Sequence, residues 1–99
     1  MSIKLLEIDT SPKPNKRYMA KFQMPNGRTR TTHFGDPRYQ TYIDTHDKFQ
    51  RDRYWTRHNK DLRTNDATRA GYLSAYLLWG DSSTLLENIR KYKQLFNIG

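Results

Sequence analysis

The residues best suited to chemistry lie between positions 48 and 63, where basic and aromatic side chains are interleaved. The basic residues are Lys48, Arg51, Arg53, Arg57, Lys60 and Arg63, and the rings among them belong to Phe49, Tyr54, Trp55 and His58. Such cations neutralise phosphates and release counterions, and aromatic rings can stack on exposed bases. An equally supported alternative is a solvated helix face whose arginines pair with Asp47, Asp52 and Asp61, with the rings in the core.

A second basic cluster lies on a predicted β-hairpin. Its members are Lys21, Arg28 and Arg30, with Lys16 and Arg17 just before them. The first 38 residues hold eight basic and three acidic side chains, which makes them the most positive part of the chain. A basic two-stranded ribbon can enter a major groove or lie along phosphates. The alternative is an exposed sheet face whose charges protect its edge. We interpret the cluster as suited to loose phosphate contact rather than to base-specific recognition.

The sequence does not favour catalysis or a metal. His33, His46 and His58 could join Asp44 or Asp47 around an ion, but their spacing matches no metal-binding signature. His46 and His58 would lie roughly 18 Å apart along one helix, so they could not share an ion. There is no glycine-rich phosphate loop and no nucleophile elbow. We therefore expect structural histidines, no cofactor and no enzymatic activity.

Composition points to a polyanionic partner. The 99 residues suggest a single domain over 1–99 and carry a net charge of +8 with a sequence pI near 9.9. Such a balance favours nucleic acid, an acidic protein or an anionic membrane surface. Cysteine is absent, so no disulfide or thiolate metal site is possible. Because neither a signal peptide nor a membrane span is recognisable, we expect a soluble intracellular protein that does not bind membranes.

The N-terminal third predicts strands. Residues 1–16 read as an extended arm or first strand and a loop, and 17–34 as a β-hairpin around Asn26-Gly27. A two-residue turn would pair Met24 with Thr29, Phe22 with Thr31 and Ala20 with His33. Tyr18, Ala20, Phe22 and Met24 would then face the helices, and Lys21, Arg30 and Thr32 would face outward. If Pro25 forces a bulged turn, this register slips and the facing changes.

The remaining chain predicts a three-helix region over 44–96. The first helix would span about 45–62, begin at Asp44 or Thr45, and allow Asp47 to pair with Arg51. The central apolar helix would run from an Asp66 cap to Gly80, which would take a left-handed conformation. The last helix would start at a Thr84–Glu87 capping box and bury Leu85, Ile89, Tyr92 and Phe96. The predicted fold class is α+β: an antiparallel hairpin or three-stranded sheet, then three helices packed around the central one.

Four strings together resemble a known family. They are Thr32 to Gly35, Arg51 to His58, Thr68 to Gly80 and Leu85 to Lys93, of which Thr68 to Gly80 is the most specific. They resemble a family of small basic proteins encoded by nucleocytoplasmic large DNA viruses, over roughly residues 17–96, with nothing shared in the first sixteen. The resemblance implies a virus-encoded protein without assigned activity, packaged in the particle, and supplies no catalytic residues.

These observations give a first hypothesis and two alternatives. The first is a non-enzymatic virion protein that binds DNA or RNA phosphates, or packages the genome, and is found in the virion and in the host cytoplasm or nucleus during infection. Its predicted contact residues are Lys21, Arg28, Arg30, Arg51, Arg53, Arg57 and Lys60. The main alternative is a minor capsid or scaffold protein that bridges acidic surfaces of coat subunits. A metal-dependent nuclease that uses His33 is a distant third.

Overall fold

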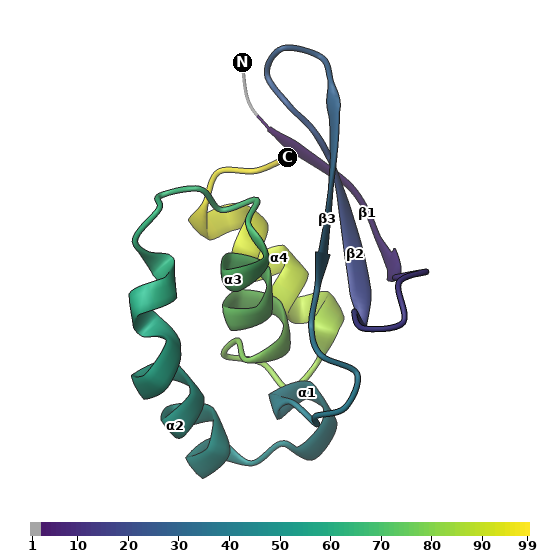
Figure 1. The fold of residues 1–99 in the computed structure, drawn as a ribbon. Helices are drawn as coiled ribbons and strands as arrows, with labels where there is room; N and C mark the ends of the chain where they lie inside the picture. The colour runs from purple at the N-terminus through teal and green to yellow at the C-terminus, as the bar shows by residue number, and fades with distance from the viewer. Residues whose placement is uncertain (1–2) are drawn as a thin grey trace.

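The computed structural model describes residues 3–99, apart from the side chain of Asp61. Met1 and Ser2, which the predicted N-terminal arm includes, lie outside the described residues. A three-stranded antiparallel sheet in the order β1-β2-β3 comes first, and helices follow it. In Figure 1 the sheet forms one side of the molecule, α3 and α4 lie in the middle, and α2 is on the far side. The predicted α+β fold class is confirmed.

The hairpin turn has three residues rather than two. Strands β1 (Lys4–Thr10), β2 (Tyr18–Gln23) and β3 (Thr29–Phe34) form the sheet. The Gly27 N–H donates to the Met24 carbonyl at 2.9 Å, and Gly27 has a φ of 84°. Proline suits the first central position of a type I turn, and a left-handed glycine after it completes a three-residue loop. The two-residue register was therefore wrong, and the bulged alternative forms.

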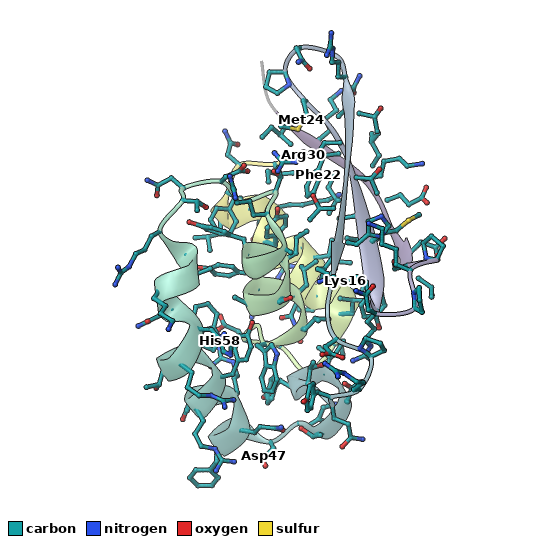
Figure 2. The ribbon with its side chains drawn as sticks, viewed as in Figure 1. Lys16, Phe22, Met24, Arg30, Asp47 and His58 are labelled. Atoms are coloured by element: carbon teal, nitrogen blue, oxygen red, sulfur yellow. The ribbon has the colours of Figure 1, made fainter. Side chains whose placement is uncertain are left out.

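The altered register changes which side chains of β3 face the helices. Phe22 pairs with Arg30 and Ala20 pairs with Thr32, so each pair shares one face of the sheet. Because Phe22 and Ala20 are fully buried, their partners Arg30 (labelled in Figure 2) and Thr32 point toward the helices. Our prediction that they face outward was wrong, since a slip of one residue moves a strand's side chains to the opposite face.

Two helices and a 3₁₀ turn replace the single helix predicted over 45–62. They are α1 (Tyr42–Thr45), α2 (Lys48–His58) and η1 (Asn59–Leu62). His46 adopts a left-handed φ of 59° and ends α1. The Asp47 carboxylate then accepts hydrogen bonds from the N–H groups of Phe49 and Gln50, at 3.0 and 3.2 Å. Asp47 therefore begins α2 in the role predicted for Asp44 or Thr45, and Arg51 pairs with Asp81 instead.

The central helix begins later than predicted and changes its winding. Asp66 accepts hydrogen bonds from the N–H and hydroxyl of Thr68, so residues 66–69 form a turn before α3 (Ala70–Leu73). A π-helical segment, η2 (Ser74–Leu78), follows, and the Trp79 N–H donates to the Ser74 carbonyl at 3.1 Å. Gly80 does not have the predicted positive φ. It is constrained by space, because a Cβ there would overlap the Tyr76 carbonyl and lie 2.7 Å from the Asn88 Oδ1.

The last helix, α4 (Leu85–Leu95), begins after the predicted Thr84 cap, but the predicted capping box is only half formed. The Thr84 hydroxyl accepts a hydrogen bond from the Glu87 N–H, whereas the Glu87 carboxylate pairs with Arg90 rather than returning to the cap. Asn97, with a φ of 52°, ends the helix through a bond from the Ile98 N–H to the Lys93 carbonyl. The Gly99 N–H then donates to the Ile3 carbonyl at 2.9 Å, which ties the last residue to the start of β1.

One core joins the sheet to the helices. Its largest fully buried apolar side chains are Phe22, Phe34, Leu73, Leu77, Leu78 and Tyr92. By contrast, α2 has no buried residue, so one side of it is free to face solvent. Within residues 3–99, the helices are all too short or too polar to span a membrane.

Candidate nucleic-acid interface

An exposed row of side chains runs along the outer face of α2 and η1, and we call it the α2 stripe. It consists of Phe49, Arg53, Arg57 and Lys60. Their spacing of four, four and three residues places them on one helix face, with Arg53 and Arg57 about 6 Å apart along the axis. Phe49 is 82% exposed. Among the described side chains, no carboxylate forms an ion pair with Arg53, Arg57 or Lys60. The stripe therefore presents uncompensated positive charge.

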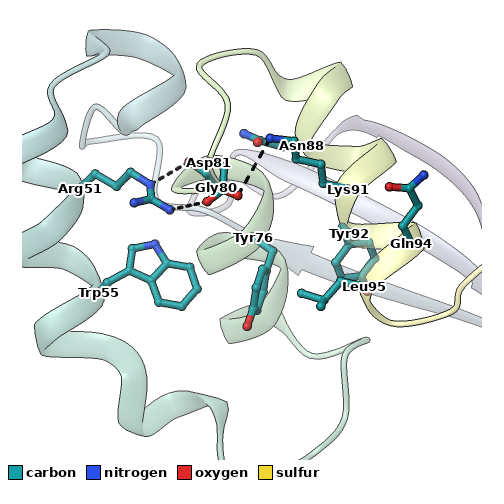
Figure 3. A pocket seen from close by; sticks show the side chains of 10 residues that line it. All are labelled: Arg51, Trp55, Tyr76, Gly80, Asp81, Asn88, Lys91, Tyr92, Gln94 and Leu95. Atoms are coloured by element: carbon teal, nitrogen blue, oxygen red, sulfur yellow. Dashed lines mark hydrogen bonds and ion pairs between the residues drawn. The ribbon is translucent and has the colours of Figure 1, made fainter.

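The opposite face of α2 packs on η2 and the residues that follow it. The Tyr54 ring stacks on the Trp79 ring with centroids 4.4 Å apart, and the Trp55 indole donates to the Trp79 carbonyl at 2.7 Å. Arg51 donates to the Gly80 carbonyl at 2.8 Å and pairs with Asp81 at 3.0 Å (Figure 3). Three residues that the sequence suggested for nucleic-acid contact, Arg51, Tyr54 and Trp55, therefore hold α2 against the rest of the protein. Phe49, by contrast, faces solvent.

The hairpin residues do not form one patch. The Arg30 guanidinium, on the helix-facing side of the sheet, pairs with Asp66 at 3.3 Å. Lys21 lies on the outer side, where Glu7 is its neighbour on β1. Arg28 is exposed beside the turn. The seven predicted contact residues therefore occupy separate surfaces, and only Arg53, Arg57 and Lys60 lie together.

Internal ion pairs use a minority of the basic side chains. Seven of the eighteen lysines and arginines have a carboxylate partner within the part of the chain described here: Arg17, Arg30, Arg38, Arg51, Arg69, Arg90 and Lys91. One of these contacts joins both terminal nitrogens of Arg17 to Asp44, at 2.6 and 2.5 Å. Hydrogen bonds from Arg17 and from Thr41 lower the pKa of Asp44 to about 2. The α2 stripe and its exposed neighbours Lys48 and Arg63 lie outside these pairs.

The histidines occupy three separate environments. The His33 Nδ1 lies 2.8 Å from the Ser11 hydroxyl, His46 occupies the left-handed position after α1, and the His58 ring stacks on Tyr54. Across the residues that the structure describes, no three histidine, aspartate or glutamate side chains gather as a metal site would require.

A buried amide that our sequence analysis missed organises one wall of a cleft. The cleft has a volume of about 560 Å³ and lies between α2, η2 and α4 (Figure 3). Asn88 donates to the carbonyls of Leu77 and Ser82, at 3.0 and 2.8 Å, and accepts from the Ser82 N–H at 2.9 Å. The sequence did carry a signal for this role, because Asn88 lies four residues after the Thr84 cap, on the buried side of an amphipathic helix. Because these groups bond to the protein itself, the cleft offers few free polar groups.

The chain matches a family of unknown function (DUF5754) over residues 6–58, which is more than half of its length, and it belongs to that family. The match runs from β1 through α2. It therefore includes residues before position 17, where we saw nothing shared, and stops before the central string that we took as most specific. No curated protein and no solved structure shows significant similarity to the chain.

Proposed function

We propose that this protein is a non-enzymatic nucleic-acid-binding protein that contacts phosphates through the α2 stripe. The observation that carries the proposal is the row of Arg53, Arg57 and Lys60, which are exposed and have no acidic partner among the described side chains. Phosphate contacts of this kind release counterions and depend little on sequence. The partner is therefore the backbone of DNA or RNA.

The other predicted contact residues have unequal parts in this proposal. Arg28 and Lys21 remain secondary contacts, since neither forms an ion pair within residues 3–99. We leave out Arg30 and Arg51, because binding a phosphate would require each to give up an internal partner, Asp66 or Asp81. The contact surface is thus narrower than the sequence alone suggested.

We place this activity in the particle of a large DNA virus, where the protein would package or coat the genome. The support is the sequence resemblance described above, together with the net charge of +8. A packaging protein must bind any sequence, which agrees with contacts to phosphates rather than to base edges.

A salt series tests the proposal. The wild-type affinity for a duplex should fall linearly on a log–log plot as salt rises. Changing Arg53, Arg57 and Lys60 together to alanine should reduce the magnitude of that slope by about 2 to 3, because each phosphate contact contributes about 0.9. Fluorescence anisotropy with a labelled duplex at several salt concentrations measures both quantities.

A charge-matched variant controls for net charge. Lys4, Lys13 and Lys93 lie on β1, on the loop after it and on α4, away from the stripe, and replacing them with alanine removes the same charge. This control should keep most of the wild-type slope. Equal loss in both variants would show a diffuse charge effect, and binding that is absent or insensitive to salt would contradict the proposal.

A second candidate function is a minor capsid or scaffold protein that bridges acidic coat surfaces. Phe49 favours it, because an exposed aromatic ring next to arginines has the composition of an interface hot spot. Fractionation of disrupted particles separates the two functions. The protein should travel with the genome under the first proposal and with the shell under the second.

A further inference from the structure

A second cleft, of about 630 Å³, opens on the flank of α2 beside the stripe. Gln50, Tyr54 and Arg57 line its α2 wall, Lys16 and Gln40 lie on loops across from them, and Ser74 and Trp79 come from η2 and its end. Lys16 and His58, both labelled in Figure 2, also line this cleft. Because Arg57 belongs both to the stripe and to the cleft wall, the cleft is continuous with the proposed phosphate surface.

The lining combines three kinds of group that suit one nucleotide. The Tyr54 and Trp79 rings make part of the lining apolar, although their faces are not open, because the two rings stack on each other and His58 stacks on Tyr54. The side chains of Gln40 and Ser74 make no hydrogen bond within the described structure, so they can bond to a base edge. Lys16 and Arg57 form no ion pair within the described structure, so both can bind phosphates. The volume falls in the usual range of about 300–1,000 Å³ for small-ligand sites.

The cleft also borders a π-helical segment, which independently supports a functional role for it. Ser74 begins η2, and its carbonyl accepts the i to i+5 hydrogen bond from Trp79. Such segments are rare and occur frequently at functional sites. The cleft in Figure 3 has fewer side chains free to bond to a ligand, because its Asn88 and Arg51 already bond to backbone carbonyls of the protein.

We infer that the cleft receives one unpaired base of a single strand whose neighbouring phosphates lie on the α2 stripe. The inference rests on the proposed function and specifies its substrate. A base inside a duplex is paired and stacked, so inserting it would require flipping it out, whereas a single strand presents it directly. The protein should therefore bind a single strand more tightly than a duplex of equal length.

The test compares a labelled oligothymidine with a duplex of equal length, using the full chain. Changing Gln40 and Ser74 together to alanine removes two hydrogen-bonding groups without changing charge. Single-strand affinity should fall about fivefold or more, on the order of what two such bonds supply. Duplex affinity and both salt slopes should stay as in wild type.

The matched control changes Gln23 and Ser83, which are the same residue types outside the cleft, to alanine, and it should bind as wild type. If the double variant does not fold, Gln40→Ala alone, in a loop, replaces it. Equal wild-type affinity for both nucleic acids, or a cleft variant that keeps full single-strand affinity, overturns the inference and leaves the proposed function standing. Absence of binding to either nucleic acid overturns both.

Discussion

At the scale of single residues, an arginine's role depends on what lies opposite its guanidinium. Arg51 and Arg53 are two positions apart on α2, yet Arg51 bonds to the Gly80 carbonyl and to Asp81, while Arg53 faces solvent. Two residues correspond to about 200° around a helix, so the two side chains leave on nearly opposite faces. One arginine therefore fixes the helix, and the other remains available for a phosphate.

Asp44 gives a residue-scale prediction about pH. Its carboxylate accepts hydrogen bonds from Arg17 and from the Thr41 N–H, which it caps at 2.7 Å. Asp44→Asn should lower the free energy of unfolding at pH 7 by about 1–2 kcal/mol, because it removes a charge-assisted contact and half of a capping box. Urea denaturation at a series of pH values measures the difference between wild type and variant.

The direction of the pH effect follows from the pKa of Asp44. Folding lowers that pKa from 3.8 to about 2, so the unfolded chain binds the proton more readily. The stabilisation is complete above about pH 5 and is lost as pH falls toward about 2, where wild type and variant should converge. Asp52→Asn is the control, since no hydrogen bond to the Asp52 carboxylate is present in the described structure. A difference that persists at pH 2 would contradict this account.

At the scale of elements, caps and turns decide where helices begin and how strands pair. Asp47 rather than Asp44 starts α2, because His46 takes a left-handed conformation and ends α1. Pro25 and Gly27 set a three-residue turn and with it the facing of β3. The start of α2 and the turn type each depend on which of several neighbouring residues takes the role. Each outcome changes where side chains of the proposed contact surface point.

Asn88 gives an element-scale prediction, because it ties α4 to η2 and to the loop between them. Its side chain is 1% exposed and bonds to the backbone of Leu77 and Ser82. Asn88→Ala should lower the free energy of unfolding by about 2–4 kcal/mol, since it leaves buried backbone groups unpaired. The midpoint of urea denaturation should fall with an unchanged slope.

Gln94→Ala on the same helix is the matched control for that change. The Gln94 side chain is exposed, and within the described structure its one hydrogen bond comes from the exposed Arg90 side chain. Its loss should therefore cost no more than about 0.5 kcal/mol. Equal effects of the two substitutions would show that Asn88 contributes nothing beyond ordinary helix packing.

At the scale of the whole molecule, the arrangement of elements in layers separates basic side chains that form internal ion pairs from those that remain exposed. The sheet and α3 with α4 share the core, and α2 lies outside them without a buried residue of its own (Figure 1). The acids that pair with arginines, including Asp44, Asp66 and Asp81, lie where elements meet. The outermost helix face therefore keeps its positive charge.

Much of the fold could be predicted from sequence because its signals are local. Alternation in Tyr18 to Met24, the position of the turn near Asn26-Gly27 (although not its length) and the amphipathic pattern of α4 each depend on neighbouring residues alone. Less of the candidate site could be predicted. No local pattern distinguishes Arg30 from Arg28. The Arg30 guanidinium pairs with Asp66, which is 36 positions away, whereas the Arg28 guanidinium has no acidic partner in the described structure.

The sequence by itself determined the excess of positive charge, the α+β order of elements and an aromatic core without cysteine. Only the tertiary structure decided which cations remain free, which rings are buried and where clefts open. The physical reason is that composition and short-range periodicity act within a few residues, whereas an ion pair or a cleft requires segments distant in sequence to meet.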